Sequence, residues 1–192
     1  MIGILAVQGA FVEHAHMLDT LGAEHFEIRK RADMDAHVLD ALLLPGGEST
    51  VMEKLLRELE LFDPLAERIR RGTPVFGTCA GMILLAKQVV NDTRTGFAAM
   101  DIAVRRNAYG RQLGSFSTYA PFAGVGEVPM VFIRAPYIED VLSPSVQVLA
   151  EVGGHTVAAR QMNMLATAFH PELSEDVRIH RYFLENMVYG RS

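Results

Sequence analysis

The only cysteine of the chain lies in a segment that is typical of a catalytic nucleophile. Cys79 has one glycine two residues before it and another two residues after it. The apolar pair at 75–76 predicts the end of a buried strand, and the apolar run 82–90 predicts a helix. A nucleophile on a sharp strand-to-helix turn needs small neighbours, because the backbone there is crowded. Unpaired N–H groups at the helix start would favour a thiolate, so we interpret Cys79 as a nucleophile rather than as a buried core thiol.

A histidine and a glutamate that are close in sequence could complete such a site. Pro171 biases His170 toward an extended conformation, in which residues two apart point to the same side. Glu172 would then orient the His170 imidazole, which would serve as the base for Cys79. The alternative is a surface turn, and the elbow cysteine favours the catalytic interpretation. We expect the remaining histidines of the chain, which has seven, on the surface or in packing positions.

Two further kinds of group would serve acyl transfer at this cysteine. Gly46 and Gly47 allow the backbone to approach a ligand closely, and the Gly47 N–H could stabilise an oxyanion together with the Ala80 N–H. Arg106 and Arg134 lie near the ends of predicted strands, and an arginine can clamp a carboxylate in bidentate fashion. The alternatives are an ordinary tight turn and solvated surface arginines. A phosphate cradle is less favoured, because the lysine of a P-loop is missing.

Strands and helices alternate through the first half of the chain. Apolar segments predict strands at residues 2–7, 24–29, 41–44 and 75–76. Helical spacing predicts helices at residues 11–21, 48–59, 65–71 and 82–90, with a polar connection at 33–40. This order predicts an α/β fold with a mostly parallel sheet that helices cover on both faces. Ligands bind beyond the carboxyl ends of such strands, where Gln8, Gly47 and Cys79 all lie.

The second half contains more strands and more turn residues. We predict strands at residues 101–106, 115–122, 128–133, 146–152, 156–161 and 165–169. Gly153 and Gly154 predict a hairpin turn, and residues 175–188 have the apolar spacing of a helix. No linker or repeat divides the chain, so we expect residues 1–192 to form one domain with a more antiparallel C-terminal part.

Composition excludes several classes of protein. The net charge of -5 provides no general attraction for nucleic acid or for an anionic membrane. One cysteine cannot form an internal disulfide or a four-cysteine zinc site, and no histidine lies in a metal-ligand motif such as HExxH. No apolar run reaches transmembrane length, and the short apolar segment 1–7 predicts a core strand rather than a signal peptide. We therefore expect a soluble cytoplasmic protein without a metal site.

Three segments around these residues resemble the class I glutamine amidotransferases. They are residues 77–81 (Gly-Thr-Cys-Ala-Gly), 44–50 (Leu-Pro-Gly-Gly-Glu-Ser-Thr) and 169–173 (Phe-His-Pro-Glu-Leu). Three others are similar to the glutaminase subunits of pyridoxal 5′-phosphate synthases, namely residues 5–14, 106–112 and 132–136. Many amidotransferases share the first three motifs, whereas the second three are far more specific. The resemblance covers nearly the whole chain.

The resemblance implies a fold, an activity and a set of site residues. The fold would be flavodoxin-like with three layers, and the catalytic triad would be Cys79, His170 and Glu172. The enzyme would be a glutaminase that hydrolyses L-glutamine to L-glutamate and ammonia without a metal or an organic cofactor. The residues that would hold glutamine are Gly47, Glu48, Ser49, Arg106, Ile133 and Arg134.

The same resemblance implies a partner. The ammonia would pass to the separate, barrel-shaped subunit of pyridoxal 5′-phosphate synthase within a hetero-oligomeric complex. That subunit would combine it with ribose 5-phosphate and glyceraldehyde 3-phosphate. The chain departs from the usual family pattern at Arg105, where an acidic residue is common, and at Met162, where glycine is commoner.

Other interpretations of the same residues lead to different experiments. An amidotransferase subunit of another synthase, or a related cysteine hydrolase, would share the triad but not the partner. A non-enzymatic nucleotide-binding module would use Gly46 and Gly47 to hold phosphate. A redox-sensing scaffold would use only the thiol of Cys79. Binding and turnover of glutamine would support an amidotransferase. Binding of nucleotides would support the nucleotide-binding module, and thiol oxidation without turnover would support the redox sensor.

Overall fold

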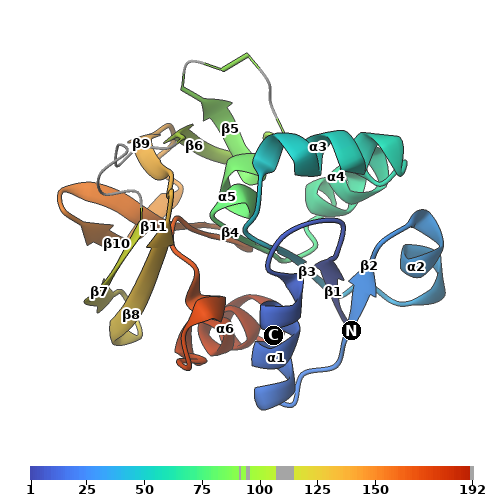
Figure 1. Ribbon diagram of the computed structural model, residues 1–192, viewed down its shortest axis with the longest axis horizontal. Helices are drawn as coiled ribbons and strands as arrows, with labels where there is room; N and C mark the ends of the chain where they lie inside the picture. Colours follow the sequence, from blue (N-terminus) through green and yellow to red (C-terminus); the bar gives the residue numbers. More distant parts are fainter. Residues whose placement is uncertain (91, 94–95, 107–114, 191–192) are drawn as a thin grey trace.

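Short aliphatic segments form the parallel half of a ten-stranded sheet (Figure 1). The computed structural model describes residues 1–90, 92–93, 96–106 and 115–190. Every residue of β1, β3, β4 and β12 is buried, as expected for strands that helices cover on both faces. In order across the sheet, the parallel strands are β2 (His25–Ile28), β1 (Ile2–Leu5), β3 (Ala41–Leu44), β4 (Val75–Thr78) and β12 (Met164–Thr167).

Helices connect these strands and cover the sheet. They are α1 (Phe11–Thr20), α2 (Arg31–Ala36), α3 (Ser49–Glu58), α4 (Phe62–Arg70), α5 (Ala80–Leu85) and α6 (Arg178–Phe183). Figure 1 shows α1 and α6 on one side of the sheet and α3 and α4 on the other side. This is a three-layer α/β arrangement of the flavodoxin-like type, so the predicted fold class is confirmed.

The C-terminal half adds antiparallel strands. The sheet continues from β12 through β11 (His155–Gln161), β9 (Tyr137–Val141), β6 (Met100–Arg105) and β5 (Ala86–Val89). β10 (Val146–Val152) forms the predicted hairpin with β11, and Gly153 and Gly154 in its turn have φ angles of 59° and 80° that favour glycine. β7 (Ser115–Phe122) and β8 (Gly126–Ile133) form a separate antiparallel ribbon.

Several local predictions are wrong. The helix expected at 82–90 ends at Leu85, and the next four residues form β5, which pairs in parallel with β6. The polar connection expected at 33–40 overlaps α2, a short helix. β9 has no counterpart among the predicted strands, because its central Glu139 and Asp140 obscure the apolar alternation. In each case pairing or packing with a distant segment outweighs weak local propensity.

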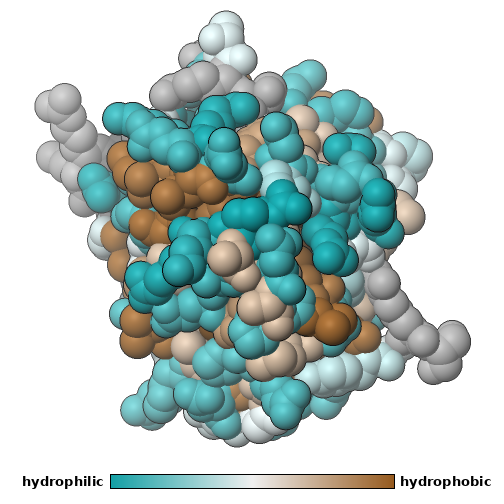
Figure 2. All heavy atoms as spheres, turned by 90° about the vertical axis from the view of Figure 1, so that its right-hand side faces the viewer, coloured by the Kyte–Doolittle hydropathy of each residue, from teal (hydrophilic) through white to brown (hydrophobic). Residues whose placement is uncertain are grey.

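Polar side chains cover most of the face that Figure 2 shows, and apolar side chains gather there in separate patches. Within the described ranges, no helix is long and apolar enough to cross a membrane. Some apolar side chains are nevertheless strongly exposed, and Met162 is exposed to 76%. This methionine lies in the turn between β11 and β12, so the reason for its exposure is the turn itself.

We expect the substitution Met162→Gly to stabilise the protein. Met162 has a φ of 54°, in the left-handed region that glycine adopts without strain. A side chain there costs about 1–2 kcal/mol, while the extra chain entropy of glycine costs about 0.5–1 kcal/mol. Because the methionine side chain is exposed, we expect a net gain of roughly 0.5–1 kcal/mol in the free energy of unfolding, measured by urea denaturation. The control Met162→Ala keeps the Cβ atom and should change little; equal gains in both variants would contradict the explanation.

Candidate active site

Cys79 lies on a sharp turn between β4 and α5. Its φ of 48° and ψ of -100° are unusual for a residue with a side chain. Such a conformation costs about 1–3 kcal/mol and persists only where the surroundings impose it. The Cys79 N–H donates a 2.7 Å hydrogen bond to Thr167 O, and the Cys79 carbonyl accepts a 3.2 Å bond from the Ile83 N–H. The expected strand-to-helix turn is therefore present, and contacts with β12 and α5 hold it.

The two glycines around this turn let α5 pack directly against the sheet. A Cβ atom on Gly77 would lie 2.7 Å from the Gly81 carbonyl carbon. A Cβ atom on Gly81 would lie 2.0 Å from Leu44 O at the end of β3. Both distances are far below van der Waals contact, and the opposing atoms are backbone that cannot rotate away. The glycine spacing is therefore a packing requirement that places Cys79 at the carboxyl ends of the strands.

His170 and Glu172 form a buried pair beside this cysteine. The distance from His170 Nδ1 to Glu172 Oε1 is 2.7 Å, and the two residues are exposed to only 6% and 4%. His170 itself is non-helical as predicted, with a φ of -105° and a ψ of 87°, but the extended segment expected to continue to Glu172 is absent, because a short 3-10 helix (Pro171–Leu173) follows. The strand expected at 165–169 also ends earlier, at Thr167. The tight turn, and not strand alternation, brings the carboxylate next to the imidazole.

Burial and hydrogen bonding set the charges of this pair. Burial by itself lowers the pKa of His170, but hydrogen bonds to the Cys79 side chain and to Glu172 outweigh burial and raise that pKa to about 10. Burial raises the pKa of Glu172, yet the interaction with His14 and the hydrogen bond with His170 leave it below its usual value. Near neutral pH the site therefore holds an imidazolium and a carboxylate. A neighbouring imidazolium favours the thiolate form of cysteine.

The lowered pKa of Glu172 predicts a loss of stability in acid. Below the unfolded value of 4.5, the unfolded chain binds a proton at this carboxyl that the folded chain does not. The stabilising contribution is therefore complete above pH 4.5 and is lost as the pH falls toward the folded pKa. We expect the wild type to lose stability relative to Glu172→Gln in this window, at up to about 1.4 kcal/mol per pH unit. Urea denaturation from about pH 6 to about pH 3 measures the difference, and a constant difference would contradict the prediction.

A cavity of about 290 Å³ adjoins these side chains. Small-molecule sites typically measure about 300–1,000 Å³, so this cavity suits a small ligand. Ala80 and Glu172 do not line the cavity and are buried. The other predicted site residues all line it, namely Gly47, Glu48, Ser49, Cys79, Arg106, Ile133, Arg134 and His170. In the part of the chain that the structure describes, no group of three or more His, Cys, Asp or Glu is placed to hold a metal ion.

The loop after β3 is held against the imidazole by its small residues and by Gln8. A Cβ atom on Gly46 would lie 2.1 Å from His170 Cε1, so only glycine fits there. Gly46 O accepts a 3.0 Å hydrogen bond from the Ala10 N–H, and Gln8 Oε1 accepts a 2.8 Å bond from the Glu48 N–H. Gln8 is therefore part of the cavity wall and orders its loop. The sequence signal for this residue is its position directly after the predicted first strand at residues 2–7; the observed strand β1 ends earlier, at Leu5.

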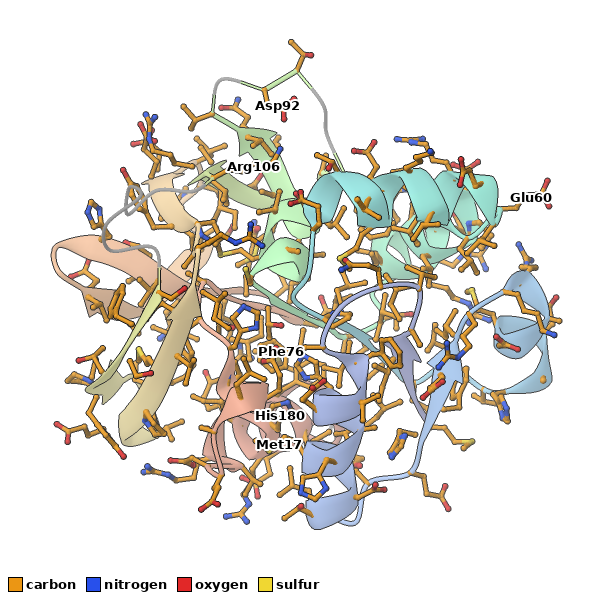
Figure 3. The ribbon with its side chains drawn as sticks, viewed as in Figure 1. Met17, Glu60, Phe76, Asp92, Arg106 and His180 are labelled. Carbon is orange, nitrogen blue, oxygen red and sulfur yellow. The ribbon has the colours of Figure 1, made fainter. Side chains whose placement is uncertain are left out.

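Arg106 lies between two carboxylates. Its Nη2 is 3.1 Å from Glu48 Oε1, and its Nη1 is 3.3 Å from Asp92 Oδ2. Figure 3 shows the side chains of Arg106 and Asp92 toward the end of the molecule where β5 and β6 lie. A free α-amino acid carries one carboxylate and one ammonium group. It could bind with its carboxylate on Arg106 and its ammonium group near Glu48, whereas a phosphate would meet two repelling carboxylates.

Two other arginines near strand ends have different surroundings. Arg134 follows β8 with a φ of 43° and lines the cavity. Arg105 pairs instead with Glu139 of the neighbouring strand β9, with its Nη2 2.8 Å from Glu139 Oε1. Arg105 does not line the cavity. The positive charge of Arg105, at a position where the family commonly has an acidic residue, is therefore paired with Glu139 outside the cavity.

Two buried histidines lie behind the site, which agrees with the packing alternative predicted for them, but the contact of His14 with Glu172 is not predicted from the sequence. His14 Nε2 is 3.6 Å from Glu172 Oε2, and His14 Nδ1 is 2.9 Å from His180 Nε2. The buried side of α1 consists of His14, Met17 and Leu18. A histidine at helical spacing with apolar residues is therefore the signal that could identify this contact, because a buried polar group needs a partner.

Comparisons with known proteins agree with this geometry. The profile of the SNO glutamine amidotransferase family matches residues 4–189. The chain is 58% identical over 189 residues to the pyridoxal 5′-phosphate synthase subunit PdxT of Methanocorpusculum labreanum, covering 98% of each chain. It is 52% identical over 191 residues to PdxT of Desulfitobacterium hafniense, covering 100% of this chain and 95% of the relative.

Solved structures show the same fold. A crystal structure described as that of a glutamine amidotransferase is 45% identical in sequence, with a TM-score of 0.89 over 96% of this chain and 97% of the other. The structure of PurLQS from Thermotoga maritima has a TM-score of 0.61 over 96% of this chain and 97% of the other. Because the second pair is only 14% identical, it supports the fold alone.

Proposed function

The chain belongs to the SNO glutamine amidotransferase family, and on that premise we propose that it is the glutaminase subunit of a pyridoxal 5′-phosphate synthase. The relatives named PdxT, at 52% to 58% identity over almost their full lengths, support this assignment. We also propose that residues 1–192 act as one amidotransferase domain, since the family match spans residues 4–189. A subunit of another synthase, or a related cysteine hydrolase, is the alternative.

The observation that carries the proposal is the position of one thiol, one imidazole and one carboxylate at the base of an amino-acid-sized cavity. Cys79 and His170 line the cavity, and Glu172 is 2.7 Å behind His170. The Cys79 thiolate attacks the side-chain carbonyl carbon of glutamine and forms a tetrahedral intermediate. His170 protonates the departing nitrogen, so ammonia leaves and a glutamyl thioester remains.

The second half of the reaction uses the same groups. His170, now neutral, takes a proton from water, and the resulting hydroxide attacks the thioester carbonyl. The carbon–sulfur bond breaks, which releases glutamate and restores the Cys79 thiolate and the His170 imidazolium. Glu172 orients the imidazole and stabilises its positive charge throughout. We assign the Gly47 and Ala80 N–H groups as donors to the oxyanion of both intermediates.

Recognition of glutamine follows from the charges at the cavity wall. The α-carboxylate of glutamine would bind the guanidinium of Arg106. The α-ammonium group of glutamine would lie near the carboxylate of Glu48, which is 3.1 Å from Arg106. Ser49, Ile133 and Arg134 line the remaining wall. We propose that ammonia then passes to a barrel-shaped synthase subunit, the partner that the sequence resemblance implies; the name of the PdxT relatives supports membership of a pyridoxal 5′-phosphate synthase.

A labelled-nitrogen experiment tests the proposed function. The chain is incubated with amide-labelled ¹⁵N-glutamine, with and without the barrel-shaped synthase subunit and its two sugar phosphates. We expect release of glutamate in the presence of that subunit and the label in pyridoxal phosphate. Glutamate release without labelled product would exclude the proposed partner. No glutaminase activity in the complete mixture would exclude the proposed enzyme.

We expect Arg106→Lys to weaken glutamine binding. Lysine cannot offer the planar two-point contact of a guanidinium, so the KM for glutamine should rise by about 10- to 100-fold with a smaller change in kcat. Arg105→Lys is the matched control, because the neighbouring Arg105 pairs with Glu139 outside the cavity. Steady-state kinetics measures both variants, and an equal rise of KM in the two would contradict the assignment of Arg106.

A further inference from the structure

We propose that His14, supported by His180, is a positioning residue that holds the Glu172 carboxylate in place for His170. The proposal rests on the glutaminase function proposed above. Neither histidine lines the cavity, so neither is expected to touch substrate. They would act only through Glu172, from helices α1 and α6.

His14, His180 and Glu172 form a continuous buried chain. His14 Nε2 is 3.6 Å from Glu172 Oε2, and His14 Nδ1 is 2.9 Å from His180 Nε2. The two histidines are exposed to 0% and 1%. Figure 3 shows His180 near Phe76, and their ring centroids are 5.5 Å apart. Glu172 thus has His170 at one carboxylate oxygen and His14 at the other.

The hydroxyl of Thr78 determines where the proton of His14 lies. Thr78 Oγ1 is 3.4 Å from Glu172 Oε1 and 3.2 Å from His14 Nε2. An ionised carboxylate can only accept, so the single hydroxyl proton points to Glu172. The hydroxyl oxygen then accepts from His14, which places a proton on Nε2. The same N–H lies 3.6 Å from Glu172 Oε2, which is beyond hydrogen-bond distance, and Glu172 Oε2 has no hydrogen-bond partner among the described residues. The contact of His14 with this oxygen is therefore electrostatic, and its hydrogen-bonded link to Glu172 runs through Thr78.

The position of that proton determines the tautomer of His180. With its proton on Nε2, neutral His14 presents Nδ1 as an acceptor, so His180 donates from Nε2. His180 Nδ1 is buried and has no hydrogen-bond partner within the described part of the chain. It is therefore the unprotonated nitrogen, because a buried N–H without an acceptor costs more than a bare lone pair. If instead the proton of His14 were on Nδ1, the lone pair on His14 Nε2 would point toward the carboxylate of Glu172, which is unfavourable.

Both histidines are neutral in this arrangement. Burial lowers the pKa of His14, and the charge of His170 lowers it further, although Glu172 and Glu13 act in the opposite direction. Burial and His14 together lower the pKa of His180 to about 3. Neutral His14 donates its hydrogen bond to Thr78 Oγ1 and presents the same N–H dipole to Glu172 Oε2, without adding a second positive charge. His170 therefore remains the cation that Glu172 stabilises.

Replacement of His14 tests this role. His14→Leu removes the donor, and His14→Gln offers an amide N–H near the position of Nε2. Removal of outer hydrogen-bond partners from metal-binding histidines costs about 10- to 100-fold in activity, and we expect a similar loss of kcat for His14→Leu with KM nearly unchanged. His14→Gln should recover at least about a third of the wild-type kcat. Equal losses in both variants would overturn the positioning role.

A second readout separates positioning from packing. The rate of Cys79 alkylation by iodoacetamide, followed against pH, reports the thiolate that His170 stabilises. We expect the midpoint to rise by about half a pH unit or more in His14→Leu, because Glu172 stabilises the imidazolium less well. The control Leu18→Ala alters a fully buried residue of the same helix and should lower stability without moving the midpoint. A midpoint shift in the control alone, or in neither variant, would overturn the proposal.

The tautomers themselves can be measured without any variant of the network. Nitrogen NMR of ¹⁵N-histidine-labelled wild type should show His14 and His180 as neutral rings, both protonated on Nε2, near neutral pH. A proton on His14 Nδ1, or a charged His14, would overturn the proposal. These two measurements need no glutaminase turnover. If wild type released no glutamate, the proposed function would fail, while the NMR and alkylation results would still show whether His14 positions Glu172.

Discussion

Replacement of Cys79 by alanine is expected to abolish glutaminase activity while the chain remains folded. Loss of the nucleophile in the triad of a hydrolase costs on the order of 10⁶-fold in kcat. We expect glutamate release to fall by at least about 10⁴-fold, measured with the barrel-shaped synthase subunit present. The physical reason is that no other cysteine exists in the chain to form the thioester. Glutamate release at the wild-type rate would exclude the proposed mechanism.

The companion substitution Cys79→Gly separates activity from backbone strain. The φ of 48° and ψ of -100° are accessible to glycine but strained for alanine. Both variants should be inactive, whereas Cys79→Gly should have a free energy of unfolding about 1 kcal/mol or more above that of Cys79→Ala. Urea denaturation measures this difference. Equal stabilities would show that the turn is not strained in the free protein.

We expect Gly81→Ala to destabilise the protein more than any loss of a single surface contact would. The new Cβ atom would lie 2.0 Å from Leu44 O, and both the turn and β3 would have to move apart. Because the obstacle is backbone at the end of a strand that has neighbours on both sides, we expect a loss of at least about 3 kcal/mol in the free energy of unfolding. Misplacement of Cys79 should remove glutaminase activity in whatever fraction remains folded.

Gly22→Ala is the matched control for this prediction. Gly22 has a φ of 66° and nothing within 4 Å of its Cβ position, so alanine there costs only the left-handed conformation, about 1–2 kcal/mol. Gly22 lies at the end of α1 and does not line the cavity. Urea denaturation compares the two variants. If Gly81→Ala lowered the free energy of unfolding no more than Gly22→Ala does, direct packing of α5 on β3 would not explain why residue 81 is glycine.

Much of the site could be predicted because its residues follow strands that are easy to identify. Buried aliphatic runs such as Ala41–Leu44 have a clear signal, and the residues after such strands meet at one end of a parallel sheet. This geometry brings Glu48, Cys79 and His170 to one cavity. The proline after His170 suggested the right neighbour, Glu172, for the wrong reason, because a 3-10 turn replaces the extended segment.

The sequence by itself determined the order of the strands in the parallel half and of its helices other than α2, the glycine-flanked turn at Cys79 and the arginine near the end of β6. These features depend on local backbone sterics and on the periodicity of burial, which a short segment encodes. The tertiary structure alone decided that residues 86–89 form a strand, that Arg105 pairs with β9, and that His14 meets His180. The last contact joins residues 166 positions apart. Such partners depend on how whole elements pack, and no local pattern specifies them.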